Sequence, residues 1–214
     1  SKLICSDSKQ KKFFNLNHFP KVKILIVNEC EIELIEKYTF SNFSQLEQLD
    51  LSSNQIESLH LNSFFSLGNL IDLNINENKI KIIKKESFIG LDNLRKLDLS
   101  NNLIESIEEK GFYGLFSLSE LDLSYNTIEI IKNRSFFGLD NLRKLDLSSS
   151  SIGSFEDEAF YGLHNLYELN LRFNRIKIVK KKSFFGLDNL IKIILRSNLI
   201  ESFEEEGFYG LNNM

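Results

Sequence analysis

Residues 46–56 read Leu-Glu-Gln-Leu-Asp-Leu-Ser-Ser-Asn-Gln-Ile, and this stretch decides the fold. Its pattern, Leu-x-x-Leu-x-Leu-x-x-Asn-x-Ile, returns along the chain without insertion or deletion. The first Leu stands at seven positions spaced 24 residues apart, at Leu46, Leu70, Leu94, Leu118, Leu142, Leu166 and Leu190. A fixed period of this length is typical of chains that stack one coil on the next. The sequence therefore predicts a solenoid in a single domain, because the repeat leaves no room for a linker.

Each repeat opens with a short stretch that alternates inward apolar and outward polar residues. Residues 94–99, Leu-Arg-Lys-Leu-Asp-Leu, show this alternation, which is typical of a half-buried strand. Stacked repeats bring these stretches side by side, so we expect one parallel sheet. If residues 22–27 are included, the pattern predicts eight strands and a sheet roughly 34 Å across, from a spacing of about 4.8 Å per strand.

Three other repeat positions are predicted to be structural. An inward Asn should bond backbone groups of its own and the adjacent coil, while a Phe should stack on its neighbours and a Gly should form a turn. Ser150 takes the place of the Asn in one repeat, and its shorter hydroxyl predicts a weak point. The Asn positions are 54, 78, 102, 126, 174 and 198; the Phe positions are 64, 88, 112, 136, 160, 184 and 208; the Gly positions are 90, 114, 138, 162, 186 and 210.

The 24-residue period, the Phe positions and phrases such as Phe-Gly-Leu-Asp-Asn-Leu at 137–142 resemble the typical class of leucine-rich repeat in animal extracellular proteins. Toll and Toll-like receptor ectodomains and related adhesion proteins carry this class. The resemblance implies an α/β-type horseshoe with a parallel concave sheet and with loops, turns and short helical segments on the convex side. It also implies a partial N-terminal cap in residues 1–21, followed by eight consecutive repeats in 22–214 that end in a C-terminal truncation.

The two cysteines are Cys5 and Cys30. Cys30 takes the position that Asn holds in later repeats, and we interpret it as a buried structural residue. Residues 3–20 resemble the end of the N-terminal cap in extracellular proteins of this class, where a Cys at this point pairs with one before it. That partner would precede Ser1, so the resemblance implies either a truncated cap or a free Cys5.

Composition argues against several kinds of partner. The net charge is -4 and the pI is about 5.5, which disfavours nucleic acid and anionic membranes, since both attract cationic surfaces. No apolar run approaches the roughly 18 residues that would span a bilayer. The chain has no initiator Met or signal peptide, and Met214 stands where the next repeat's Leu is due. We therefore expect a mature or excised fragment of a longer extracellular or cell-surface protein.

Charge alternates from repeat to repeat on the flank that follows the Asn. Counting Lys and Arg against Asp and Glu gives +2, -2, +1, -3, +4 and -4 for residues 81–86, 105–110, 129–134, 153–158, 177–182 and 201–206. Residues 24 apart are stacked neighbours, so the alternation predicts a continuous ladder of ion pairs. A duplicated two-repeat unit also accounts for it, because residues 90–100 recur unchanged at 138–148.

The sequence offers no catalytic, metal or cofactor site. His18, His60 and His164 fall at unrelated repeat positions, with no spacing typical of a metal site or a catalytic triad. A row of carboxylates at 50, 98, 122 and 146 belongs to the Leu-Asp-Leu of the repeat. No glycine-rich phosphate loop is present. We therefore expect a protein that is not an enzyme and binds no cofactor.

The concave face departs from its Asp, Ser and Asn pattern only in the later repeats. Exposed aromatic residues, Arg and Ile together are typical of the centre of a protein interface. We expect them to form a protein-binding patch, although a few exposed apolar residues are also ordinary on any surface. The patch comprises Tyr125, Tyr167, Arg172, Phe173, Ile191, Ile194 and Arg196.

Three hypotheses for function remain. The first is a recognition module for a protein ligand or co-receptor on the concave face, as receptor or adhesion domains of this class provide, including those of innate immunity. The second is a structural or matrix protein that self-assembles, in part through an uncapped C-terminal end. The third is an intracellular scaffold or enzyme inhibitor. The sequons at Asn42 and Asn133 are glycosylation candidates and suit secretion, although about three sequons would also arise by chance in a chain this rich in Asn and Ser.

Overall fold

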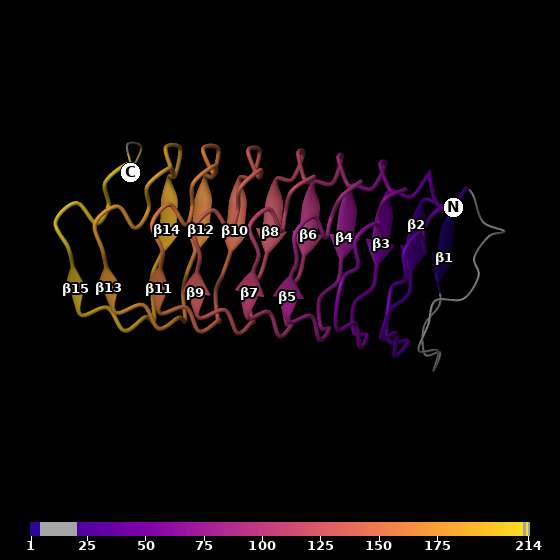
Figure 1. The fold of residues 1–214 in the computed structure, drawn as a ribbon, viewed down its shortest axis with the longest axis horizontal. Coiled ribbons are helices and arrows are strands. Elements are labelled where there is room, and N and C mark those ends of the chain that lie inside the picture. The colour runs from indigo at the N-terminus through magenta and orange to yellow at the C-terminus, as the bar shows by residue number, and fades with distance from the viewer. Residues whose placement is uncertain (5–20, 212, 214) are drawn as a thin grey trace.

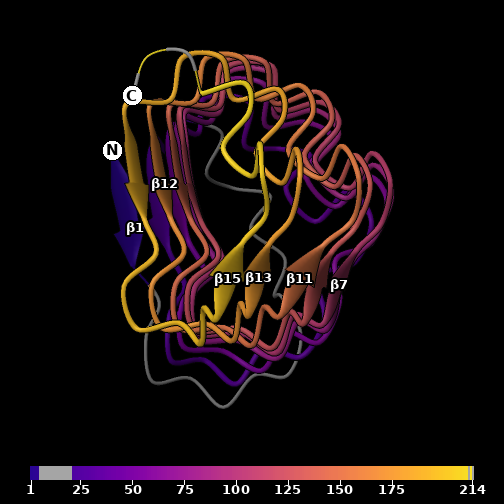
Figure 2. The ribbon, with the colours of Figure 1, turned by 90° about the vertical axis from the view of Figure 1, so that its left-hand side faces the viewer.

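The chain forms a solenoid of stacked coils with one long parallel sheet along one side (Figure 1). The computed structural model describes residues 1–4, 21–211 and 213. Viewed along its axis, the sheet lies on one side of the coil and the turns lie opposite (Figure 2). The strands of this sheet, in order, are β1 (Lys2–Ile4), β2 (Ile24–Ile26), β3 (Gln48–Asp50), β4 (Asp72–Asn74), β6 (Lys96–Asp98), β8 (Glu120–Asp122), β10 (Lys144–Asp146), β12 (Glu168–Asn170) and β14 (Lys192–Ile194).

The sheet therefore has nine strands, and the expectation of eight was wrong by one. From β2 onward, each strand pairs with the residues 24 positions later, as Lys144 does with Glu168. The additional strand is β1, which pairs in parallel with β2, Leu3 against Leu25. Repeat counting missed it because residues 2–4 lie only 22 positions before their partners and carry no repeat signature. Cys5 and its expected pairing lie outside the described residues.

The core consists of the predicted ladders of apolar side chains. The leading Leu of every repeat is fully buried. The Phe ladder begins one coil earlier than expected, at Phe40, and runs to Phe208 with ring centroids 5.7–6.2 Å apart. Stacked aromatic rings at this separation add to the stabilisation that burial of their area supplies.

The predicted Asn ladder links consecutive coils through backbone groups. The Nδ2 of Asn126 donates to the carbonyls of Leu99 and Leu123, at 3.1 and 2.9 Å, while its Oδ1 accepts from the Ile104 amide at 2.9 Å. One side chain thus satisfies buried polar groups on two coils, which would be costly to leave unpaired. Ser150 fails to do this, as expected, because its Oγ is buried without a hydrogen-bond partner. Cys30, also at this position, is buried as expected.

The convex side is built from turns, and the expected short helical segments are absent from the described residues. Successive i to i+3 bonds shape it, such as Leu91 amide to Phe88 carbonyl at 3.3 Å and Leu94 amide to Leu91 carbonyl at 3.0 Å. A helix cannot propagate there, because left-handed residues interrupt each coil. Gly114, for instance, has a φ of 104°, which residues with a Cβ rarely adopt.

A second row of short strands divides the solenoid into two-coil units (Figure 1). β5 (Ile82–Ile83) pairs with β7 (Ser106–Ile107), β9 (Ile130–Ile131) with β11 (Ser154–Phe155), and β13 (Ile178–Val179) with β15 (Ser202–Phe203). Each of these sheets has two strands, and β7 and β9 are not paired. The units are therefore β4–β7, β8–β11 and β12–β15.

A small residue in the second coil of each unit permits the close approach. A Cβ at Gly111 would lie 3.0 Å from both the Glu108 carbonyl oxygen and Cγ2 of Ile83, and Gly207 is equally confined. Ala159 holds the same place in the middle unit, while the first coils carry Ser at this position, as at Ser87. The coils therefore pack in pairs, and these pairs match the duplicated two-repeat unit of 48 residues in the sequence.

Ion pairs follow the same division, so the expectation of a continuous ladder was wrong. Lys181 Nζ lies 2.8 Å from Glu206 Oε2, and Arg134 lies 3.3 Å from Glu158. Both bridges lie within a unit. Carboxylates of the second coil also accept backbone amides of the first, as Glu108 does from the Lys85 amide at 2.8 Å. Between units, no flank ion pair occurs in the described part of the chain.

Candidate functional site

The middle of the concave face carries a shallow hollow lined by alternating charges. Its volume is about 350 Å³, and it lies over β6, β8, β10 and β12. Lys144 bridges to Glu120 at 3.7 Å, and Lys192 bridges to Glu168 at 2.7 Å, each pair within one two-coil unit. Exposed pairs of this kind contribute about 0–1 kcal/mol each. Much of the charge here is thus neutralised within the protein.

Asp122 occupies the floor of this hollow, between Asp98 and Asp146 on the neighbouring strands. Burial raises the pKa of its carboxyl above the ordinary value, and the two neighbouring carboxylates add to the effect. Hydrogen bonds from Ser124 act in the opposite direction, the backbone amide lying 2.8 Å from Oδ1. The floor is therefore acidic and unfavourable for an anionic ligand.

Three of the seven predicted patch residues come together where β12 and β14 end. Arg172 and Phe173 follow β12 directly, and the Arg172 guanidinium lies 5.5 Å from the centroid of the Phe173 ring. The Phe173 amide donates to the Arg196 carbonyl at 3.0 Å, which fixes the two turns side by side. The Phe173 residue is 52% exposed, and its backbone has a left-handed φ of 55°. This cluster presents an exposed aromatic ring with one guanidinium over it and a second arginine on the adjacent turn.

Tyr167 and Ile191 lie along the opposite edge of the sheet, which is the edge where the strands begin. They come just before β12 and β14 respectively. Both are about half exposed, and the Ile191 amide donates to the Tyr167 carbonyl at 3.0 Å. They line a hollow of about 600 Å³ together with Asn165 and Asn189. Phe173 lies six positions after Tyr167, a span of at most about 20 Å if the chain were fully extended. The structure thus divides the predicted patch between two edges of the sheet.

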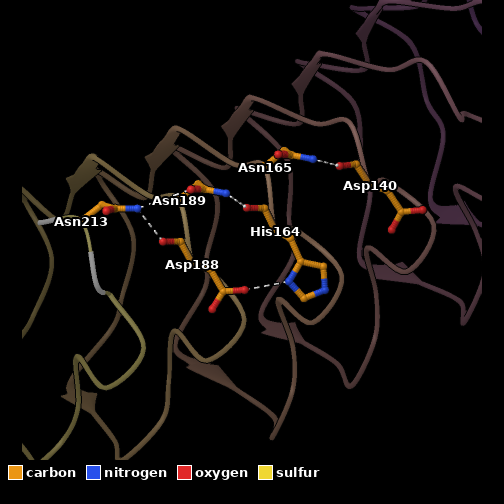
Figure 3. A network of polar contacts seen from close by, with 6 residues as sticks. All are labelled: Asp140, His164, Asn165, Asp188, Asn189 and Asn213. Atoms are coloured by element: carbon orange, nitrogen blue, oxygen red, sulfur yellow. Dashed lines mark hydrogen bonds and ion pairs between the residues drawn. The ribbon is translucent and has the colours of Figure 1, made fainter.

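The hollow beside Tyr167 is bordered by a network of asparagines (Figure 3). Each Nδ2 donates to a carbonyl of the preceding coil, Asn165 to Asp140 at 2.8 Å, Asn189 to His164 at 2.7 Å and Asn213 to Asp188 at 2.9 Å. His164 Nδ1 lies 2.8 Å from Asp188 Oδ2. These contacts join successive coils along the edge, and all three asparagines line the hollow beside Tyr167 and Ile191.

The last two predicted patch residues behave differently from each other. Ile194 lies in β14 opposite Asn170 of β12 and is partly buried, so it connects the two edges. Tyr125 is 54% exposed but follows β8, two coils before Phe173, with Ser149 between them in the same row. Tyr125 is therefore separate from the cluster at Phe173.

Comparison with known families identifies the repeat. The leucine rich repeat model matches six overlapping segments that together cover the chain from residue 20 onward: 20–80, 59–104, 92–152, 117–176, 140–190 and 164–214. The chain belongs to the leucine-rich repeat family. Comparison with the curated proteins finds no match.

Solved structures of leucine-rich repeat proteins share this architecture. The crystal structure of a TLR13–ssRNA13 complex is similar, with 29% identity and a TM-score of 0.86 over 99% of this chain and 30% of that chain. The leucine-rich repeat domain of APL1B gives a TM-score of 0.73 at 19% identity, over 97% of this chain and 58% of that one, which shows the fold alone. The chain therefore spans less than two thirds of either protein and resembles a Toll-like receptor in its repeats.

These comparisons bear on the partners expected from composition. The TLR13 structure contains single-stranded RNA, so likeness of fold does not support the exclusion of nucleic acid, which rests on the charge of this chain alone. Among the described residues, no helix is long and apolar enough to cross a membrane. Within the same residues, no cluster of three or more His, Cys, Asp or Glu could hold a metal ion.

Sequence reasoning missed one polar contact in the middle of the patch. Asn170 Nδ2 donates to Asp146 Oδ2 at 2.8 Å. The signal available in the sequence was the Asn at position 170, since an amide can donate where the three preceding coils place a carboxylate. The sequon residues Asn42 and Asn133 are both exposed.

Proposed function

We propose that this leucine-rich repeat domain is the protein-recognition part of a larger extracellular or cell-surface protein, acting as a receptor or an adhesion molecule without catalysis. The observation that carries the proposal is the cluster of Arg172, Phe173 and Arg196 at the end of β12 and β14. Arginine and aromatic residues dominate the energy of protein interfaces when a partner covers them. Here the Arg172 guanidinium lies over an exposed ring, and a backbone hydrogen bond joins Phe173 to the turn that carries Arg196.

The chemistry of the cluster indicates the kind of partner. A guanidinium over an aromatic ring, with a second arginine on the adjacent turn, suits a protein surface that offers a carboxylate next to an apolar group. Tyr167, Ile191 and Ile194 extend the contact across the sheet. The proposal places the partner over the last two coils of the concave face and leaves the charge-paired centre around Glu120 at its rim.

A nucleic-acid ligand is the alternative that the TLR13–ssRNA13 structure suggests. The central hollow speaks against it, because Asp98, Asp122 and Asp146 line its floor and would repel phosphates. A self-assembling structural protein is the other candidate, and the alternating two-coil units favour it. An intracellular scaffold is a third candidate, because it would share the fold.

The experiment begins with a natural partner isolated from extracellular extracts on the immobilised domain and then purified. Its affinity is compared for wild type, Arg172→Ala and Phe173→Ala, with Lys144→Ala and Glu120→Ala as controls on the paired centre. Each cluster variant should weaken binding by about 30-fold, equivalent to roughly 2 kcal/mol, and each control by less than about 3-fold.

A parallel titration with single-stranded RNA separates the alternatives. We expect no saturable binding at physiological salt. Cluster variants that bind the protein partner like wild type would refute the concave-face proposal, and tight salt-sensitive RNA binding would replace it with a nucleic-acid function.

A further inference from the structure

The flank stripe is a second surface whose chemistry is self-complementary. We define it as the six segments 81–86, 105–110, 129–134, 153–158, 177–182 and 201–206. The strands inside these segments form a nearly straight row along the solenoid (Figure 1). They are β5, β7, β9, β11, β13 and β15. Most of the charged side chains in these segments are exposed. The stripe lies away from the concave sheet, so a partner here leaves the proposed binding face free (Figure 2).

The order of charges along the stripe has a symmetry property. From the N-terminal end the segments carry +2, -2, +1, -3, +4 and -4. Read from the other end, the signs are opposite at all six places, because an even number of alternating signs reverses on inversion. A second copy related by a two-fold axis between β9 and β11 therefore sets cation against anion on every coil. A parallel copy in the same register would set like charges together.

Side-chain size follows the same order. The outward residue of each positive segment is an exposed isoleucine, at Ile82, Ile130 and Ile178, with 39–45% of the residue exposed. The outward residue of each negative segment is a serine, at Ser106, Ser154 and Ser202. The two-fold arrangement sets each isoleucine opposite a serine of the other copy. The larger side chain of one copy thus faces the smaller side chain of the other at each place where opposite charges meet.

A hollow of about 560 Å³ lies in the stripe, and Ser106, Leu103 and Ile130 are among its lining residues. In the two-fold arrangement Ile178 of the second copy lies opposite Ser106. Leu103 and Ile130 suit an aliphatic side chain, while Lys81 and Glu105, which also line the hollow, suit the charged neighbours of that isoleucine.

We propose that the flank stripe is an interface between two copies of this chain, packed antiparallel about a two-fold axis. Such an interface uses the same patch on both copies, which is the commonest form of homodimer. Six segments with about four outward side chains each give roughly 24 residues a side, within the 20–30 of a standard interface. Electrostatic complementarity fixes the register, since a shift by one coil would oppose like charges at each facing coil.

The proposed dimer requires that Asn133 carries no glycan, because this residue lies in the third segment of the stripe. Oligomeric state gives the first test, and protein carrying Asn133→Gln is used throughout. Sedimentation should show a dimer at low ionic strength, with a dissociation constant at least tenfold weaker at about 1 M salt, where the Debye length is near 3 Å. A chain that stays monomeric at low salt would overturn the proposal.

A variant and its matched control locate the surface. Replacing Ile82, Ile130 and Ile178 together by Ser removes three exposed side chains and should weaken the dimer at least tenfold. The control replaces Ile71 and Ile191 by Ser; these isoleucines are 42% and 52% exposed and lie on the sheet side. Equal effects of the two variants would contradict an interface at the flank stripe, and unchanged melting temperatures confirm that both fold.

Disulfide trapping tests the register. Single-cysteine variants Ile130→Cys and Ser154→Cys are mixed and oxidised, because these positions face one another across the two-fold axis. Single variants are needed because residues 130 and 154 are also strand partners within one chain. The mixture should yield a mixed disulfide in higher amount than either variant alone. A mixture of Ile130→Cys with Ser106→Cys would trap the register shifted by two coils, and its preference would overturn the arrangement.

Discussion

Replacing Asn126 by Ala should destabilise the solenoid more than the same substitution at Asn102, although both residues belong to one ladder. Asn126 Nδ2 donates to Leu99 and Leu123, and its Oδ1 accepts from the Ile104 amide. The Leu99 carbonyl keeps a second donor, Asn102, at 3.1 Å. The Leu123 carbonyl would lose the donor that Asn126 supplies, since Ser150 stands where the next coil's Asn would reach it.

The magnitude follows from counting the groups left unpaired. Asn126→Ala strands the Ile104 amide and the Leu123 carbonyl. Asn102→Ala strands only the Ile80 amide, because the Ile75 carbonyl keeps Asn78 as a donor. Each buried unpaired group costs about 1–3 kcal/mol. We therefore expect a loss of about 2–6 kcal/mol at Asn126 and about 1–3 kcal/mol at Asn102.

Urea unfolding monitored by circular dichroism measures both losses. Lys181→Ala serves as the surface comparison and should lower the midpoint least, because its ion pair with Glu206 is exposed. In a Ser150→Asn background, the loss at Asn126 should fall to that at Asn102, since the new amide also reaches Leu123. Equal losses for the two Asn variants in wild type, or a larger loss for Lys181→Ala, would refute the shared-carbonyl argument.

Three further substitutions test other parts of the structure. Ser150→Asn alone should raise the melting temperature by restoring the ladder, and a clear drop would mean that the serine has another role. Asp122→Asn should stabilise the protein at pH 7, because burial raises the folded pKa of this carboxyl above its ordinary value. The free energy of unfolding of the wild type should therefore fall as pH rises through that folded pKa. The variant should lack this fall. Gly111→Val should destabilise more than Gly153→Val, since a Cβ at Gly111 meets atoms at 3.0 Å while the nearest atom at Gly153 is 3.9 Å away; calorimetry that ranks them equally would contradict the two-coil packing.

The sequence predicted those features that every coil repeats. Leu94, Phe112 and Asn126 take their predicted places because periodic residues face identical surroundings in each coil. Features that depend on two coils together were harder to predict. The pairing of β5 with β7 depends on how closely Gly111 lets the coils approach, and its signal was an alternation of Ser with Gly or Ala.

The candidate site was predictable only as a set of residues on one face. Tyr167 and Phe173 stand at the two ends of one strand, so alternation along that strand could not reveal the distance that separates them. Tyr125 was grouped with Phe173 because both hold the same repeat position, yet Ser149 lies between them. The charge ladder was predicted to be continuous because a stacking period of 24 was assumed, whereas the contacts follow a period of 48.

Hydrogen exchange on the complex with a natural partner tests the central claim, that the end of the concave face recognises protein. Peptides covering residues 167–173 and 191–197 should exchange more slowly in the complex than in the free chain. Peptides from the flank stripe, such as 105–110, should be unchanged when the chain's own oligomeric state is held constant. Protection confined to the flank stripe or to the convex turns, with residues 167–173 unaffected, would contradict recognition by the concave face.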